Sequence, residues 1–165
     1  MIVVFDASML IDYGNNRLQG LRRQKLDFLV QSLLDNRAQV LIPAPAWAEY
    51  LIKTGAATNN IMRVLKESAH FKIVPFDERA AIECAILLQA ALTKKQRKEI
   101  TKTKLKFDWQ IIATAIVQRA TTIYSDDADI LHHCSGTHLR VMPIDDLPLP
   151  EEDAQGCLEL VISNS

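Results

Sequence analysis

Apolar and polar positions follow one another along this chain in blocks that predict strands and helices in turn. Apolar residues recurring every three or four positions predict helices that bury one face. They are expected at about 17–36, 46–54, 57–68, 78–93, 108–120 and 128–134. Short, β-branched apolar runs predict buried strands at 2–5, 39–42, 71–75, 121–125 and 139–144. Strands that alternate with helices predict an α/β fold, a central, mostly parallel β-sheet flanked by helices.

Individual residues suggest where some of these elements begin. Gly14 and the two asparagines after it predict a loop before the first long helix. Pro45 suits the first position of a helix, and Asp77 is placed to cap the helix over 78–93. The leucine-rich stripe of the helix over 17–36 would serve either the core or a contact with a second subunit.

Acidic residues occupy corresponding places in several of these units. Asp6 closes the first strand, and Asp126 and Asp127 close the fourth. Glu49 follows the second strand by one short turn, and Asp108 opens the helix before the fourth strand. The ligand crevice of a parallel sheet lies beyond the carboxyl ends of its strands, so these side chains are expected at one edge. Clustered carboxylates must take up protons or bind a cation such as Mg²⁺, which indicates a metal-dependent enzyme.

Each acid also has a purely structural explanation. Asp108 and Asp126 stand where helix caps or first-turn acids are favoured, an interaction worth about 0.5–2 kcal/mol. Asp6 is harder to explain in this way, because an acid that ends a buried strand needs a partner. Glu49 is flanked by aromatic and apolar residues, which argues against full exposure. Their shared position at one sheet edge favours a functional site.

Composition limits the number of domains and the classes of protein to which this chain can belong. The 165 residues are 48% hydrophobic and 24% charged, with a net charge of −1, which suits one globular domain with a substantial core. Cys84, Cys134 and Cys157 form no CxxC pair, so neither a disulfide framework nor a zinc ribbon is predicted, and Cys84 is expected in the core. The start lacks a basic n-region, and no apolar run approaches the ~18–20 residues of a membrane span. We therefore expect a cytoplasmic protein without a membrane segment.

Four segments, in order along the chain, resemble the motifs of the PIN-domain ribonucleases: VVFDASMLI, VLIPAPAWAEYL, KLKFDWQIIATA and TIYSDDADI. The resemblance runs from about Met1 to Leu147 and is nearest to VapC-type toxins of bacterial and archaeal toxin–antitoxin pairs. It implies a PIN-like nuclease domain over 1–147, with 148–165 as a tail or an extra edge element of the same domain. It further implies a metal-dependent endoribonuclease that uses Mg²⁺ or Mn²⁺, a cognate antitoxin protein and a homodimer.

The resemblance also assigns roles residue by residue. Three of the family's catalytic and metal-binding acids fall on Asp6, Glu49 and Asp108, with Asp6 and Asp108 as main ligands. The family usually has Thr-x-Asp-x-Asp-Phe in the fourth motif, where this chain has Ser-Asp-Asp-Ala-Asp-Ile, so the fourth acid falls on Asp127. Asp126 stays an alternative, because a shift of one residue at the strand end would turn it inward. The accessory residues are Ser8, Ser125, Asp126 and Asp129.

A basic segment leads directly into Asp108 and is expected to hold RNA phosphates. Its basic residues are Lys94, Lys95, Arg97, Lys98, Lys102, Lys104 and Lys106. Contacts of this kind are independent of base sequence and weaken with salt. A solvated loop is the structural alternative for this segment. Arg17, Arg22 and Arg23 form a weaker second candidate.

Aromatic and histidine residues near the acids suit structural roles better than catalytic ones. Trp47 and Trp109 each neighbour a proposed ligand, where packing behind the site is favoured over stacking on RNA bases. His132, His133 and His138 lack zinc-ligand spacing with the cysteines and are expected at the surface or as helix caps.

Two other classes of protein explain less of the sequence. A PIN fold that binds nucleic acid or a partner without turnover is the main alternative, and the complete set of acids argues against it. A phosphotransfer receiver needs an acidic pair at the end of the first strand, which this chain lacks. A dehalogenase-type phosphatase needs a second Asp two residues after the first, where this chain has Ser8. We therefore interpret the sequence as that of a nuclease.

Overall fold

A five-stranded sheet forms the centre of the computed structural model, which describes residues 1–55, 59–91 and 104–150. The strands are β1 (Ile2–Phe5), β2 (Gln39–Pro43), β3 (Phe71–Val74), β4 (Thr122–Tyr124) and β5 (Arg140–Met142). They lie in the order β3-β2-β1-β4-β5, and all four strand pairs are parallel. The predicted α/β fold with a mostly parallel sheet is confirmed.

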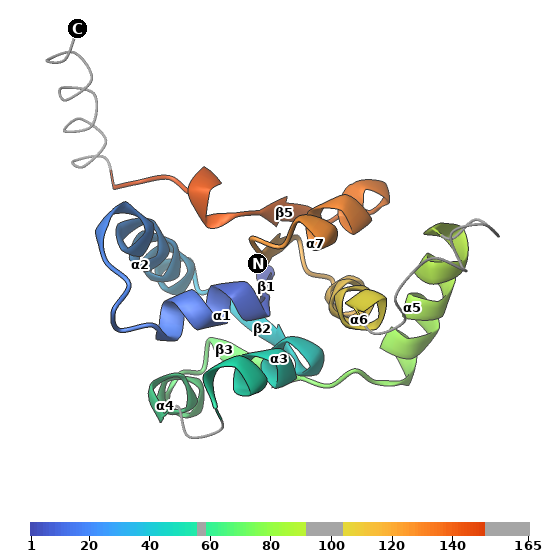
Figure 1. Cartoon of the computed structure of the whole chain (residues 1–165), viewed down its shortest axis with the longest axis horizontal. Coiled ribbons are helices and arrows are strands. Elements are labelled where there is room, and N and C mark those ends of the chain that lie inside the picture. The colour runs from blue at the N-terminus through green and yellow to red at the C-terminus, as the bar shows by residue number, and fades with distance from the viewer. Residues whose placement is uncertain (56–58, 92–103, 151–165) are drawn as a thin grey trace, which may run out of the picture.

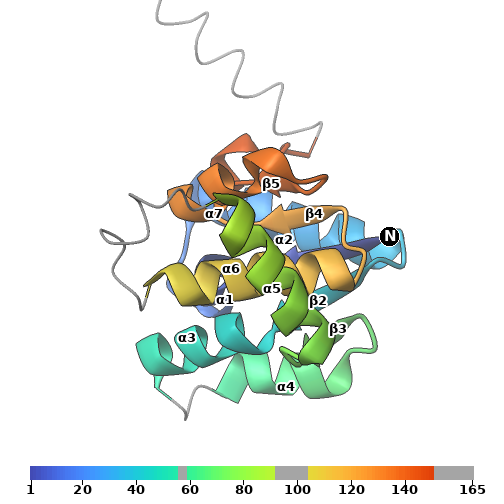
Figure 2. The same ribbon diagram turned by 90° about the vertical axis from the view of Figure 1, so that its right-hand side faces the viewer.

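Helices cover both faces of this sheet. Those in the described residues are α1 (Ala7–Gly14), α2 (Gly20–Asp35), α3 (Ala44–Thr54), α4 (Asn59–Glu67), α5 (Glu78–Ala91), α6 (Lys104–Val117) and α7 (Ala128–His133), with 3-10 turns η2 (Cys134–Gly136) and η3 (Ile144–Asp146). Helices α1 and α2 lie on one side of the sheet and α5 and α6 on the other (Figure 1). Helix α5 lies across the outside of α6 (Figure 2). Within the described ranges, no helix is long and apolar enough to cross a membrane.

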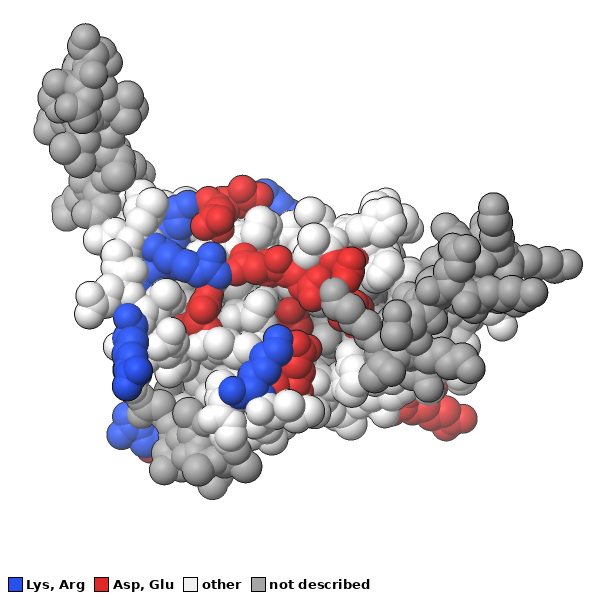
Figure 3. All heavy atoms as spheres, viewed as in Figure 1, with Lys and Arg blue, Asp and Glu red and all other residues white. Residues whose placement is uncertain are grey.

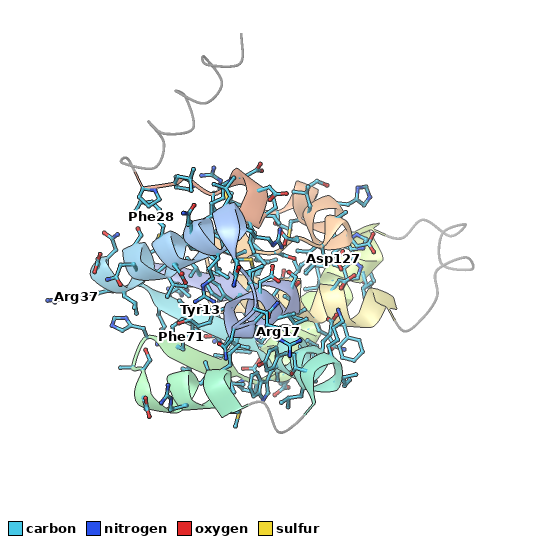
Figure 4. The ribbon with its side chains drawn as sticks, turned by 60° about the vertical axis from the view of Figure 1, so that its left-hand side comes forward. Tyr13, Arg17, Phe28, Arg37, Phe71 and Asp127 are labelled. Atoms are coloured by element: carbon cyan, nitrogen blue, oxygen red, sulfur yellow. The ribbon has the colours of Figure 1, made fainter. Side chains whose placement is uncertain are left out.

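Alternating strand residues build two apolar cores, because successive side chains point to opposite faces of a sheet. Val3 and Phe5 face the core shared with α1, α2 and α4, and Val4 faces the core shared with α6 and α7. Phe5 meets Phe71 edge-on, with ring centroids 6.0 Å apart. Tyr13 of α1 stacks on the same Phe71 at 5.9 Å (Figure 4). These contacts fix α1 against the sheet.

Several helix boundaries differ from the sequence-based predictions. Helix α1 was not predicted, because it follows β1 after the single residue Asp6 and is only eight residues long. Helix α2 begins at Gly20 rather than near residue 17. The prediction that Asp108 opens its helix is wrong, since α6 begins at Lys104. Lysine favours helix formation, so the helix extends back beyond its apolar pattern into the basic segment.

Two predicted helix starts are close to the observed ones. Pro45 lies in the first turn of α3, which begins at Ala44. The Asp77 side chain accepts a hydrogen bond from the Ala80 amide at 2.9 Å and so caps the start of α5, as predicted. Cys84 is buried in the core between α5 and α6, also as predicted.

The parallel sheet brings several helix starts to one edge. Helices α1, α3 and α7 each follow a strand directly, so they begin at the carboxyl ends of β1, β2 and β4. Helix α6 precedes β4 and runs back along it, so α6 also begins at that edge. This edge forms the face toward the viewer in Figure 1 and the left side in Figure 2.

Candidate active site at the carboxyl edge of the sheet

Asp6 lies at the centre of this edge, between β1 and α1. Its side chain is 4% exposed and makes no cap hydrogen bond to its own helix. Its Oδ2 instead accepts hydrogen bonds from Ser125 Oγ at 2.9 Å and from Ser8 Oγ at 3.3 Å. Its buried Oδ1 has no hydrogen-bond partner within the described part of the chain. Among the described residues, Asp6 therefore has a buried carboxylate oxygen that no hydrogen bond satisfies.

The surroundings of Asp6 oppose its negative charge. Burial is the largest influence on the pKa of Asp6 and raises it, while the neighbouring Ala7 amide and the hydroxyls of Ser125 and Ser8 lower it. The negative charge of Glu49 raises the same pKa further. A buried carboxylate beside a second carboxylate is stabilised either by a proton or by a cation. The environment of Asp6 therefore favours either protonation of its carboxylate or binding of a cation beside it.

Glu49 contributes the second carboxylate from the middle of α3. It is half-buried, and its Oε1 lies 2.6 Å from the Nζ of Lys53, one helical turn further on. The hydrogen bond to Glu49 raises the pKa of Lys53, and the charges of Asp6 and Asp127 raise it further. Lys53 therefore lies within the electrostatic reach of three of the four predicted acids.

Sequence reasoning did not single out Lys53. The signal was present, because a Glu followed four residues later by a Lys on a helix is the spacing of a favourable ion pair. The sequence alone did not show that this pair would point toward Asp6 rather than toward solvent.

Asp126 is turned toward α2 and η3. Its backbone amide donates to Ser8 Oγ at 3.1 Å, and its Oδ1 accepts from the Ile144 amide at 2.9 Å. Its Oδ2 accepts a hydrogen bond from Arg22, which also binds Asp12. Both carboxylate oxygens of Asp126 are thus held by the protein itself.

Asp127 has a different environment at the start of α7 (Figure 4). Its Oδ1 accepts from the Asp129 amide at 2.8 Å and caps the helix, while its own amide donates to Ser125 Oγ at 3.0 Å. The hydroxyl of Ser125 therefore joins Asp127 to Asp6. The Asp126 and Asp127 amides are both joined to Asp6 through a serine hydroxyl. The two acids differ in their carboxylates, because that of Asp126 is held by Arg22 and the Ile144 amide whereas Asp127 Oδ1 caps α7.

Asp108 lies in the second turn of α6 and is 6% exposed. Helix α6 packs against α3, α5, α7 and β2, which places its first turns beside the other site elements. The next residue, Trp109, is buried and stacks on His133 of α7 with ring centroids 4.6 Å apart. Trp109 is therefore packed within the fold, as the sequence favoured, rather than exposed for stacking on bases.

The remaining predicted residues divide into two groups. Lys94, Lys95, Arg97, Lys98 and Lys102 lie outside the described residues, and Lys104 and Lys106 lie on α6 with side chains that are not described. Arg22 and Arg23 instead form ion pairs with acids of the fold, Arg22 with Asp12 and Asp126 and Arg23 with Asp27. Arg22 is therefore a structural residue rather than a phosphate-binding one.

Acidic side chains gather across the middle of this face, with basic ones beside them (Figure 3). In the part of the chain that the structure describes, no three His, Cys, Asp or Glu side chains converge closely enough to surround one ion. Mg²⁺ does not require such a cage, because it keeps several waters and is usually held by one or two carboxylates. Asp6 fits that mode of binding, because it is buried, its Oδ1 has no partner in the described residues and the charge of Glu49 disfavours its ionisation without a cation.

Comparison with known proteins gives one family and several similar structures. The model of the PIN domain family matches residues 3–135. VapBC2 from Rickettsia felis, bound to a DNA fragment from its promoter, aligns with a TM-score of 0.61 at 15% identity over 87% of this chain and 98% of that chain. A toxin-antitoxin complex from Klebsiella pneumoniae aligns with a TM-score of 0.51 at 20% identity, covering 83% of this chain and 94% of that one.

A third similar structure is VapC20 from Mycobacterium tuberculosis, described as a Sarcin-Ricin loop cleaving toxin. It aligns with a TM-score of 0.54 at 12% identity, over 84% of this chain and 98% of that chain. Comparison with curated protein sequences gives no match. Identities this low show a shared fold.

Proposed function

The chain belongs to the PIN-domain family, and from this premise we propose that it is a metal-dependent endoribonuclease that hydrolyses RNA phosphodiester bonds. The observation that carries the proposal is the environment of Asp6. The negative charge of Glu49 raises the pKa of this buried carboxylate, and its Oδ1 has no partner in the described residues. A purely structural acid would be satisfied by the fold, whereas a ligand for a cation keeps an oxygen available.

We assign the main metal contacts to Asp6 and Asp108, the two buried acids of the site. Glu49 and Asp127 would hold a second ion or accept hydrogen bonds from its waters. When bound, Mg²⁺ or Mn²⁺ lowers the pKa of a coordinated water and offsets charge on the phosphate. Asp126 is not assigned to this set, because Arg22 and the Ile144 amide hold its carboxylate.

The other polar residues of the site position these acids. Ser125 and Ser8 both donate to Asp6 Oδ2, so they fix the orientation of its carboxylate. Ser125 also accepts from the Asp127 amide, and Asp129 supplies the amide that Asp127 caps. Held in this way, the acids would orient a water for in-line attack on the phosphodiester. The expected products carry 5′-phosphate and 3′-hydroxyl ends.

RNA must approach a face that is rich in negative charge. Positive charge beside that face would offset the repulsion, and we assign this role to the basic residues between 94 and 106, which run into α6. Their contacts would follow the RNA backbone rather than its bases. Choice of target RNA would then depend on the shape of the site.

We further propose that the chain is the toxin of a toxin–antitoxin pair and acts in the cytoplasm on cellular RNA. Two of the similar structures are complexes of a toxin with its antitoxin. A cognate antitoxin protein and a homodimer are therefore the partners we expect. Expression of the wild-type chain should arrest bacterial growth, and expression of the Asp6→Asn variant should not.

The nuclease proposal is tested by incubating the purified full chain with a mixture of structured RNAs in Mg²⁺, in Mn²⁺ and in EDTA. We expect cleavage with either metal and none with EDTA. Absence of cleavage by folded protein with every ion and substrate, combined with retained RNA binding, would overturn it in favour of a non-catalytic nucleic-acid-binding module.

A further inference from the structure

Lys53 is placed among the acids of the site but has no role in the chemistry above. Its ammonium lies 2.6 Å from Glu49 Oε1, and its side chain is 55% exposed. The charges of Asp6 and Asp127 act on it in addition to that of Glu49. Lys53 is therefore paired with one site acid and lies near enough to two others for their charges to raise its pKa.

We propose that Lys53 is a built-in counter-ion of the acidic site, with which a divalent ion competes for Glu49 when it binds. This inference rests on the proposed metal-dependent function. An ammonium paired with Glu49 and a divalent cation bound at the same carboxylate repel each other, because their charges lie at short range. Binding of the ion near Glu49 therefore competes with the lysine.

The lysine side chain is suited to leaving. It is a flexible four-carbon stem that ends in a strongly hydrated point charge. More than half of the Lys53 side chain is already exposed, so it can move into solvent without opening the core. Lys53 would thus compensate the repulsion between acids in the metal-free protein and lower its affinity for the metal.

The simpler explanation is an ordinary ion pair between neighbouring turns of one helix. The chain offers a matched example of that kind in Arg23 and Asp27, which are also four residues apart and lie 2.8 Å from one another on α2. The contact with Asp27 joins α2 to itself, Arg23 also donates to the Tyr13 carbonyl of α1 at 3.5 Å, and neither contact involves a site acid. Comparing the metal affinities of Lys53 and Arg23 variants separates a local effect on the site from the general effect of removing one positive charge.

The test is the affinity of the full chain for Mn²⁺, measured by isothermal titration calorimetry and by the loss of the free Mn²⁺ signal in electron paramagnetic resonance. Lys53→Gln should bind Mn²⁺ about two- to fivefold more tightly than wild type, the range set by an exposed ion pair of roughly 0.4–1 kcal/mol. Lys53→Arg, which keeps the charge, should bind like wild type. Arg23→Gln should also bind like wild type, although it loses the same charge.

Each outcome decides between the proposals. Tighter binding by Lys53→Gln alone supports the counter-ion. Unchanged or weaker binding by a folded Lys53→Gln variant, or an equal gain in Arg23→Gln, overturns it and leaves the nuclease proposal standing. Failure of the wild-type chain to bind Mn²⁺ overturns both. Circular dichroism in EDTA checks folding, and Lys53→Met serves as a second neutral variant.

Discussion

Two serine hydroxyls connect the end of β1 to the loop that follows β4. Ser125 donates to Asp6 and accepts from the Asp127 amide, and Ser8 donates to Asp6 and accepts from the Asp126 amide. Each hydroxyl therefore donates a hydrogen bond to Asp6, at the end of β1, and accepts one from a backbone amide in the loop after β4. Of the two, Ser125 is buried and makes the shorter bond to Asp6.

Removing the Ser125 hydroxyl should impair catalysis more than folding. Ser125→Ala removes one hydrogen bond from Asp6 Oδ2 and one from the Asp127 amide. We therefore expect kcat to fall by roughly 10–100-fold, as for loss of a hydrogen-bond partner that orients a metal ligand. Ser125→Thr keeps the hydroxyl and should retain most of the activity. Steady-state cleavage kinetics measures both. Equal activity of the alanine and wild-type proteins would show that Ser125 does not position Asp6.

Asp6 should make the metal-free protein less stable at neutral pH. Because folding raises its pKa, the folded state resists losing a proton that the unfolded state loses near the ordinary value of 3.8. Stability is therefore lost as pH rises from that value through the raised pKa. Asp6→Asn removes this penalty and, at pH 7 in EDTA, should melt about 2–4 °C higher, equivalent to about 1 kcal/mol in a domain of this size.

Thermal melts of both proteins across pH measure this effect. The difference between Asp6→Asn and wild type should shrink as pH falls toward 3.8, where Asp6 becomes protonated. A wild-type protein that is the more stable of the two at neutral pH without metal would contradict the account of a strained, buried carboxylate.

The sequence predicted where these acids would lie in the fold better than it predicted the contacts between them. Asp6 and Asp108 are buried, as acids beside apolar strands and helices suggest. The choice between Asp126 and Asp127 depended on Arg22, which lies 104 residues before Asp126 in the chain and meets it only in the fold. Lys53 was missed because the direction in which an ion pair points is a tertiary property.

At the scale of elements, Arg22 joins four segments near the site. It donates to Asp12 of α1 at 2.6 and 2.9 Å from its own helix α2, and it also binds Asp126 in the loop after β4. Its Nη1 lies 3.7 Å from Asp145 of η3. Such a residue holds the helices of one face to the loop that carries the fourth acid.

Arg22→Gln should loosen this junction. We expect it to lower the free energy of unfolding by about 1–2 kcal/mol, because it leaves the partly buried acids Asp12 and Asp126 without their shared cation. Arg23→Gln, which breaks the exposed pair with Asp27 and a long contact of 3.5 Å with the Tyr13 carbonyl, should cost about 0.5 kcal/mol or less. Urea unfolding of the two variants makes the comparison. Equal small effects would mean that Arg22 is an ordinary surface residue.

The missing and shifted elements have physical reasons. Helix α1 follows β1 after one residue and contains only about two turns, so a periodic pattern had little length in which to show. Its last residue, Gly14, is close to α3 and α4, since an added Cβ would lie 2.8 Å from Ile61 and 3.1 Å from the Tyr50 hydroxyl. Glycine there permits close helix packing, although the sequence suggested a loop.

At the scale of the whole molecule, an all-parallel sheet delivers the acids to one face (Figure 3). Four helix starts meet at that face, so residues from positions 6 to 127 contribute to one site. The net charge of −1 does not show that charges of opposite sign are separated along the chain. Acids gather at the sheet edge, while a run of basic residues precedes α6. The sequence predicted this arrangement because parallel strands must end on the same side.

The central claim is that the acids at this edge form a nuclease site, and the most direct measurement compares cleavage by two matched variants. Asp108→Asn removes a buried acid of the site, and Asp145→Asn removes an acid of η3 whose side chain is 86% exposed. In Mg²⁺ or Mn²⁺, Asp145→Asn should cleave RNA like wild type and leave 5′-phosphate ends. Asp108→Asn should lose at least about 100-fold in kcat. Wild-type cleavage that persists in EDTA, or equal cleavage by both variants, would contradict the account.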